Sequence, residues 1–181
     1  MTPYNIVLFL HIASAIALFV GYGYEWVASA LLRKASTADQ ARAWLRVFRV
    51  SPPLSGAALL VLILTGGFLG SVIKAMAQGW MTASFVAIVI ALVIGFGVIL
   101  PRVKAIRAAL PAANEALSAD ALAHLRNSVL SAAVRTRVLL ALGIVFLMTV
   151  KPDSTISAGA LGAFIGLGII ASIPAFSAKS N

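Results

Sequence analysis

Long apolar runs alternate with short polar and basic stretches along the chain, and this pattern is typical of a protein that crosses a membrane several times. A helix needs about 20 mostly apolar residues to cross the hydrocarbon core of a bilayer. Five runs approach or exceed that length, and they cover residues of about 6–32, 54–73, 80–100, 135–150 and 155–176. We therefore expect an all-α fold, a polytopic membrane helix bundle with five transmembrane helices, in a single integral-membrane domain over residues 1–181.

Proline marks the boundaries of these runs. Ser51, Pro52 and Pro53 separate the first polar stretch from the second apolar run, because proline is tolerated in the first turn of a helix. Pro101 follows the third run and Pro152 follows the fourth. We expect a helix to start or to end at each of these positions.

Two polar stretches between the runs are amphipathic, at about 37–49 and 118–134, and predict helices that lie along the membrane surface. In the first, Arg42 and Arg46 recur at helical spacing. In the second, His124 follows Asp120 by four residues on the polar face, where we expect a weak, solvated pair.

Lysine and arginine are distributed unevenly among the connections. Five lie between the first two runs and six between the third and fourth, while the other two connections and the tail carry one each. Such basic loops stay in the cytoplasm. We expect an outside N-terminus, a cytoplasmic C-terminus, and a multi-pass protein of the bacterial inner membrane whose surface helices contact an anionic cytoplasmic leaflet. The first run lacks a preceding basic segment, which predicts no cleavable signal.

Composition narrows the chemistry. With 61% hydrophobic and 10% charged residues, and a mean hydropathy of +1.03, the chain is too apolar for a soluble domain of 181 residues. The absence of cysteine excludes disulfides, iron–sulfur clusters and thiolate metal sites. The net charge of +9 is spread over membrane-flanking loops, so we expect no nucleic-acid partner.

One acidic residue of the first run has a predicted counter-ion. Tyr22, Tyr24 and Trp26 predict an interfacial aromatic belt, which places Glu25 at the cytoplasmic boundary without deep burial. The fourth run brings Arg135 and Arg137 to the same level, by the rise of about 1.5 Å per helical residue. We expect a structural ion pair between Glu25 and one of these two arginines.

His11 lies inside the first run, among leucine, isoleucine, alanine and phenylalanine. An ionisable residue at that depth is a candidate functional site. A neutral imidazole nitrogen can bind haem iron or copper. The alternative is a hydrogen bond within the bundle, with Ser14, Thr65 or Thr149 as the partner.

Methionine adds a second reason to consider a metal. On the predicted topology, Met76, Met81 and Met148 share the outer side of the membrane with His11. Thioether and imidazole groups suit Cu(I), although methionine also fills apolar gaps. Haem b and copper therefore both stay open as cofactors.

Glycine is placed where helices can approach one another. Gly66 with Gly70, and Gly162 with Gly166, are spaced as small-xxx-small pairs. Such pairs let transmembrane helices pack closely. A Ser-His-Asp set or a pair of catalytic carboxylates cannot be assembled, because the five acidic residues lie at boundaries or in loops.

Three segments carry a resemblance to a known family: FLHIASAIALFVGYGYEW at 9–26, LILTGGFLG at 62–70, and FLMTVKP at 146–152. Together they look like the uncharacterised bacterial integral-membrane family named domain of unknown function 2269. More distantly, the histidine of the first run is similar to that of copper-resistance D-type proteins and of membrane protoporphyrinogen oxidases. In the oxidases that histidine is implicated in haem binding, and the match falls on His11. The oxidases also rely on a lysine within a later helix, and the third run here has none, which argues against that activity.

Two classes of function follow. In the first, the protein is a cofactor-binding bundle with His11 as ligand near the outer leaflet. In the second, it is a non-catalytic membrane component, either a small-solute permeation protein or an accessory subunit of a larger complex, and a homo-oligomer is also compatible with the sequence. Internal repeats and broken polar helices, which mark many transporters, are not found in the sequence.

Overall fold

The computed structural model describes residues 2–111 and 116–172, and every regular element in that part of the chain is helical. The elements are α1 (Pro3–Leu32), α2 (Ala38–Leu45), α3 (Val47–Val72), α4 (Gly79–Val93), the π-helical segment η1 (Ile94–Ile99), α5 (Leu100–Ala109), α6 (Ala119–Leu125), α7 (Ser128–Val150) and α8 (Ser154–Ile170). The all-α prediction is confirmed for the described residues.

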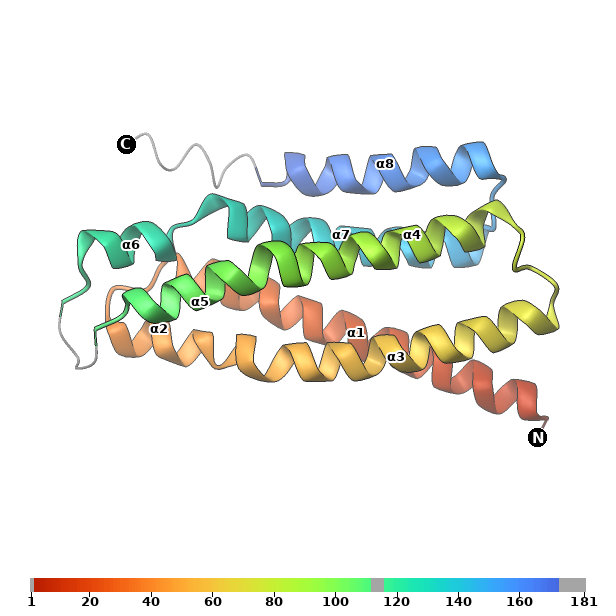
Figure 1. The fold of residues 1–181 in the computed structure, drawn as a ribbon, viewed down its shortest axis with the longest axis horizontal. Helices are drawn as coiled ribbons and strands as arrows, with labels where there is room; N and C mark the ends of the chain where they lie inside the picture. Colours follow the sequence, from red (N-terminus) through yellow and green to blue (C-terminus); the bar gives the residue numbers. More distant parts are fainter. Residues whose placement is uncertain (1, 112–115, 173–181) are drawn as a thin grey trace.

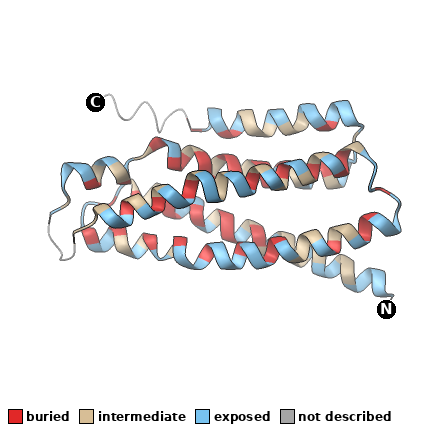
Figure 2. Ribbon diagram, viewed as in Figure 1, coloured by how far each residue is buried: buried red, intermediate tan, exposed pale blue. Residues whose placement is uncertain are grey.

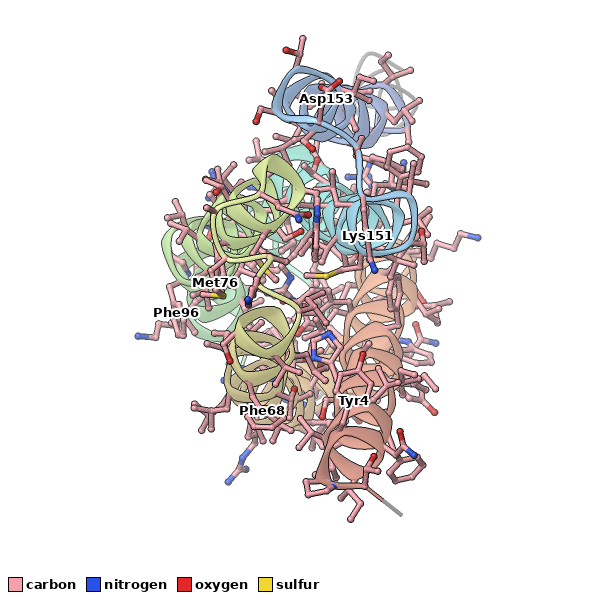
Figure 3. All side chains as sticks on the ribbon, turned by 90° about the vertical axis from the view of Figure 1, so that its right-hand side faces the viewer. Tyr4, Phe68, Met76, Phe96, Lys151 and Asp153 are labelled. Carbon is pink, nitrogen blue, oxygen red and sulfur yellow. The ribbon has the colours of Figure 1, made fainter. Side chains whose placement is uncertain are left out.

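The helices form an elongated bundle, shown in Figure 1. α3 packs along α1, and α7 packs against α1, α4 and α8. Seen end-on in Figure 3, α1, α3, α4 and α7 surround the centre while α8 lies outside them. One end of the bundle, here called the basic end, carries α2, α5 and α6, while the N-terminus and the connections at 73–78 and 151–153 lie at the opposite end (Figure 1).

Four helical stretches of the described chain are long and apolar enough to cross a membrane. They are Pro3–Leu32, Ala38–Val72, Gly79–Ala109 and Ala119–Val150. α8 is apolar but shorter, with 17 residues, and residues 173–176 of the fifth predicted run lie outside the described residues. The first four predicted spans therefore each have a matching helix, and the fifth stays a prediction.

The second span begins earlier than predicted. Pro52 and Pro53 do not start α3 but lie inside it, because the helix already begins at Val47. The carbonyl of Arg46 accepts the first amide bonds, and Phe48 is buried in the core of the basic end. Packing of this first turn therefore outweighs the two amide donors that proline removes.

Pro101 does not end the third span either. The helix continues through it as far as Ala109, after a change to π-helical geometry over Ile94–Ile99. A proline ring clashes with the carbonyl four residues before it in a regular α-helix, and the wider π turn relieves that clash. The helical stretch therefore continues through Pro101 without interruption.

The predicted surface helices are shorter than expected. α2 spans Ala38–Leu45, capped by Thr37, and the second predicted helix is divided into α6 and α7. The division falls at Asn127, whose side chain accepts a hydrogen bond from the Leu130 amide at 3.0 Å and so caps α7. As a result the fourth span starts at Ser128 rather than near 135.

Burial is concentrated in the centre and at the basic end, whereas α8 and the first part of α1 are largely exposed (Figure 2).

Two glycines bring α8 close to α7. A methyl group built on Gly143 would lie 2.9 Å from the Phe164 ring, and one on Gly168 would lie 2.5 Å from the backbone of Thr136. By contrast, Gly162 and Gly166 face open space, so this predicted pair makes no close contact with the described residues.

Candidate functional site: two neighbouring centres

A cavity of about 330 Å³ lies between α1, α3, α4 and α7, in the half of the bundle opposite the basic end. Its wall is almost entirely apolar. The lining includes His11 and Ala15 of α1, Gly66 of α3, Met81 and Ser84 of α4, and Met148 of α7. Its volume is within the range of about 300–1,000 Å³ that is usual for ligand sites. We call it the outer cavity.

His11 is held in one orientation by Thr65. The imidazole Nδ1 lies 2.9 Å from Thr65 Oγ1, and that hydroxyl donates to the Val61 carbonyl at 2.6 Å. A hydroxyl has a single proton, so Thr65 accepts from His11 and the proton of the ring lies on Nδ1. The other ring nitrogen, Nε2, is then an unprotonated lone pair. Gly66 makes room for the ring, because a methyl group there would lie 3.2 Å from His11 Cε1.

Of the three partners expected for His11, the structure selects Thr65. The Thr149 hydroxyl instead donates to carbonyls of its own helix, at 2.9 Å to Val145. The sequence analysis offers a hydrogen bond within the bundle as the alternative to a ligand role for His11. That hydrogen bond is present, but it uses only one of the two ring nitrogens. Thr65 is the side chain that hydrogen-bonds to the ring among the described residues, and the backbone of Leu62 also lies within hydrogen-bonding reach of the ring.

The predicted methionines are not equally placed. Met81 is 3% exposed and, with Met148, lines the same cavity as His11. Met76 is 48% exposed and lies in the connection before α4, at the end of the bundle that faces the viewer in Figure 3. A methyl group built on Gly70 would lie 2.6 Å from Met81 Cε and 3.0 Å from Met76 Sδ, so the two methionines lie on the same side of α3. Within the described residues, no group of three or more His, Cys, Asp or Glu side chains is arranged to hold a metal ion.

A second polar centre lies near the basic end. Arg137 of α7 forms an ion pair with Glu25 of α1, as predicted from helix lengths. Ser51 of α3 donates to Glu25 Oε1 at 2.9 Å, and the Arg137 guanidinium lies 4.2 Å from the centre of the Tyr22 ring. Three helices thus meet in one hydrogen-bonded and cation–π cluster.

Two expectations about this centre are wrong. Glu25 was expected to need no deep burial, but it is 1% exposed, because Ser51 and Arg137 close over it from α3 and α7. The sequence places Tyr22 in the aromatic belt, but its side chain is 4% exposed and packs on Arg137, whereas Tyr24 and Trp26 lie on the surface. The predicted alternative partner, Arg135, donates instead to the Ala171 carbonyl at the end of α8.

Further toward the surface, Arg33 donates to the Arg126 carbonyl at 2.7 Å. Its own burial, and then the neighbouring positive charges of Arg135 and Arg126, lower the pKa of Arg33. The cations of the basic end are therefore crowded enough to repel one another.

A smaller pocket of about 110 Å³, here called the inner pocket, opens beside this cluster. Tyr22, Glu25, Ser55 and Arg137 supply its polar wall, and Leu59 lines both this pocket and the outer cavity. The two sites are therefore neighbours along the bundle. The sequence pattern predicts a helix boundary at Ser51 and does not mark Ser51 or Ser55 as site residues, although their spacing of four residues places both on one helix face.

A comparison with models of protein families shows to which family the chain belongs. Residues 5–152 match the model of a family described as predicted integral membrane protein, DUF2269. The chain belongs to the DUF2269 family. The resemblance carried by residues 9–26, 62–70 and 146–152 is thereby confirmed, and this DUF2269 protein is a multi-pass membrane protein. No curated protein and no solved structure matches it.

Proposed function

We propose that this DUF2269 protein is a haem-binding helix bundle of the bacterial inner membrane, with Nε2 of His11 as the iron ligand. One observation carries the proposal: Thr65 accepts a hydrogen bond from Nδ1 of His11 and so fixes the orientation of a ring that lines an apolar cavity. Histidines that bind metals are usually oriented in this way by a hydrogen bond at the other ring nitrogen.

The residues present fit a haem better than a bare ion of Zn or Fe. A macrocycle supplies four ligands itself, so a single imidazole is sufficient, whereas a bare ion requires several side chains that the described residues do not bring together. The apolar wall suits a largely apolar ring. When bound, haem would supply one-electron redox chemistry. The chain itself binds the ring, sets the tautomer of His11 and excludes water.

Copper(I) is the second candidate, and a separate observation favours it. Met81 and Met148 line the same cavity as His11, and thioether with imidazole is a ligand set that Cu(I) prefers. Met76, although exposed, lies against Gly70 next to Met81 and could complete that set. Metal analysis separates this candidate from haem.

The test is an absorption spectrum of the protein in mild detergent, oxidised and reduced, with metal analysis of the same sample. We expect a Soret band that disappears in His11→Ala and persists in His124→Ala. His124 is the matched control, because its side chain is 39% exposed and lies next to Asp120 on the surface. Stoichiometric copper without a Soret band would favour the second candidate.

Protein grown with haem and copper available, yet free of both, would overturn both candidates. His11 would then serve helix packing through Thr65 alone. The protein would belong to the other class, a permeation protein or an accessory subunit, and a search for homo-oligomers or complex partners would follow.

A further inference from the structure

An open groove at the basic end, here called the arginine groove, is lined by arginines from segments far apart in the sequence. α2 packs against α3 and α5 there, and these helices lie together at one end of the bundle in Figure 1. The groove has a volume of about 600 Å³, and its lining consists of Arg42, Leu45, Arg46, Arg49, Arg107, Leu110 and Pro111. It is therefore large enough for a small ligand and carries mainly positive charge.

Two of the arginines fix the shape of the groove. Arg107 of α5 donates to the Leu45 carbonyl at the end of α2, at 3.2 Å. In the opposite direction, Arg42 of α2 donates to the Pro111 carbonyl and pairs with Asp39 at 2.6 Å. These hydrogen bonds join the two sides of the groove, so its shape does not depend on a bound ligand.

The other two arginines present their charge to the surroundings. Arg46 and Arg49 are exposed, and their guanidinium groups form no hydrogen bond or ion pair with the described residues. They are three residues apart, about one helical turn, where like charges repel. An anion bound between them would remove this repulsion and would accept their hydrogen bonds.

Arg46 also lines a second, apolar groove of about 320 Å³ between α1 and α3. Its wall includes Val47, Val50 and Leu54 of α3 and Tyr24 of α1. Val50 is 66% exposed and Tyr24 is 61% exposed, and both belong to helical stretches that can cross a membrane. An exposed tyrosine is typical of the level where head groups meet hydrocarbon. Arg46 therefore separates a basic site from an apolar one at that level.

The two grooves together define the ligand. Arginine binds phosphate oxygens through paired hydrogen bonds, and basic pockets at the cytoplasmic ends of membrane helices bind lipid head groups. We propose that Arg46 and Arg49 bind the phosphate of one anionic phospholipid, with an acyl chain along the apolar groove. A free phosphate ion would leave that groove unused. The site is more specific than the general contact of surface helices with an anionic leaflet, and it does not depend on a cofactor at His11.

The double variant Arg46→Gln with Arg49→Gln tests the site. The probe is dioctanoyl-phosphatidylglycerol, titrated into the full-length protein in nonionic detergent after removal of copurified lipid, and bound molecules are counted by native mass spectrometry. We expect one tightly bound molecule per native protein and binding roughly 30-fold weaker in the variant, since each cation beside a lipid phosphate contributes about five- to sixfold in affinity. Thermal stability should be unchanged, because neither guanidinium has a partner among the described residues.

The matched control is Lys34→Gln with Lys104→Gln. It removes the same number of charges from exposed side chains near the same end, and neither lysine lines the two grooves. Charges that do not touch the phosphate are screened over about 8 Å at physiological ionic strength, so we expect a loss of less than about twofold. Dioctanoyl-phosphatidylcholine and inorganic phosphate are titrated in parallel, and both should bind at least about tenfold more weakly than the anionic lipid.

Equal loss of affinity in the two double variants would show a general attraction to positive charge and would overturn the proposal. Inorganic phosphate that binds as tightly as phosphatidylglycerol would assign the groove to a free anion, and equal affinity for phosphatidylcholine would remove the role of charge. Either result, or the absence of saturable lipid binding by the native protein, would also overturn it. His11→Ala should keep the lipid affinity, so failure of the proposed haem site and failure of this site are distinguishable.

Discussion

Glu25 and Arg137 carry opposite charges inside the bundle, where each depends on the other for neutralisation. Removing one partner of a buried ion pair costs about 3–5 kcal/mol, because the remaining charge stays desolvated. We expect Glu25→Gln and Arg137→Gln each to lower the free energy of unfolding by about that amount. Denaturant titration in detergent, followed by circular dichroism, measures it.

The double variant is the control for this prediction. With both charges removed, no unpaired ion remains, so the loss should be clearly smaller than the sum of the two single losses. Strict additivity would show that the two side chains act independently, contrary to the contact between them.

Thr65 controls the orientation of His11, and Thr65→Val removes the hydroxyl at nearly constant volume. If His11 binds haem, the loss of this supporting hydrogen bond should weaken haem binding about 10- to 100-fold without abolishing it. Titration of hemin into apoprotein, followed at the Soret band, measures the affinity. Thr149→Val is the control, because Thr149 lines the same cavity but bonds to its own helix. Equal loss in both variants would contradict the role of Thr65.

The residue scale shows what a sequence can and cannot predict about the site. The pairing of Glu25 with Arg137 followed from counting helical rise, because both lie on long, regular spans. The burial of Glu25 did not follow, since it depends on Ser51 arriving from a third helix. The choice of Thr65 among three hydroxyl partners for His11 depends on helix rotation in the same way.

At the scale of elements, apolar length was a better guide than proline. Each of the first four predicted spans has a helix, but Pro52, Pro53 and Pro101 lie within helices instead of ending them. Each proline removes one backbone hydrogen bond from its helix. Burial of Phe48 offsets that loss in α3, and the π-helical turn before Pro101 relieves the clash of the proline ring. Neither effect can be read from the order of apolar and polar residues.

The contact between α7 and α8 gives a prediction at this scale. An alanine at Gly168 would press on the backbone of Thr136, which cannot move aside, so Gly168→Ala should destabilise the protein by about 1–3 kcal/mol. Gly166→Ala enters open space and should be neutral or stabilising by up to about 1 kcal/mol, because alanine favours a helix over glycine. Thermal unfolding of the two variants in one detergent compares them. A lower transition temperature for Gly166→Ala than for Gly168→Ala would contradict the packing.

At the scale of the whole molecule, the outer cavity and the inner pocket are neighbours, because Leu59 lines both. α3 packs mainly on α1, and α7 packs against α1, α4 and α8. Both sites use side chains from α1, α3 and α7. The same three helices therefore fix the geometry of both sites.

The orientation of the bundle gives the last prediction. α2, α5 and α6, which accompany the two basic connections, gather at one end, and we expect that end in the cytoplasm because loops rich in lysine and arginine are retained there (Figure 1). The chain has no cysteine, so single cysteines report on exposure without background. Ala77→Cys lies in the connection at the opposite end, whereas Ser36→Cys and Ala116→Cys lie at the basic end, and all three positions are exposed. A membrane-impermeant maleimide should label Ala77→Cys in intact cells and the other two only after lysis. The reverse pattern would invert the topology and would place the outer cavity, with His11, on the cytoplasmic side.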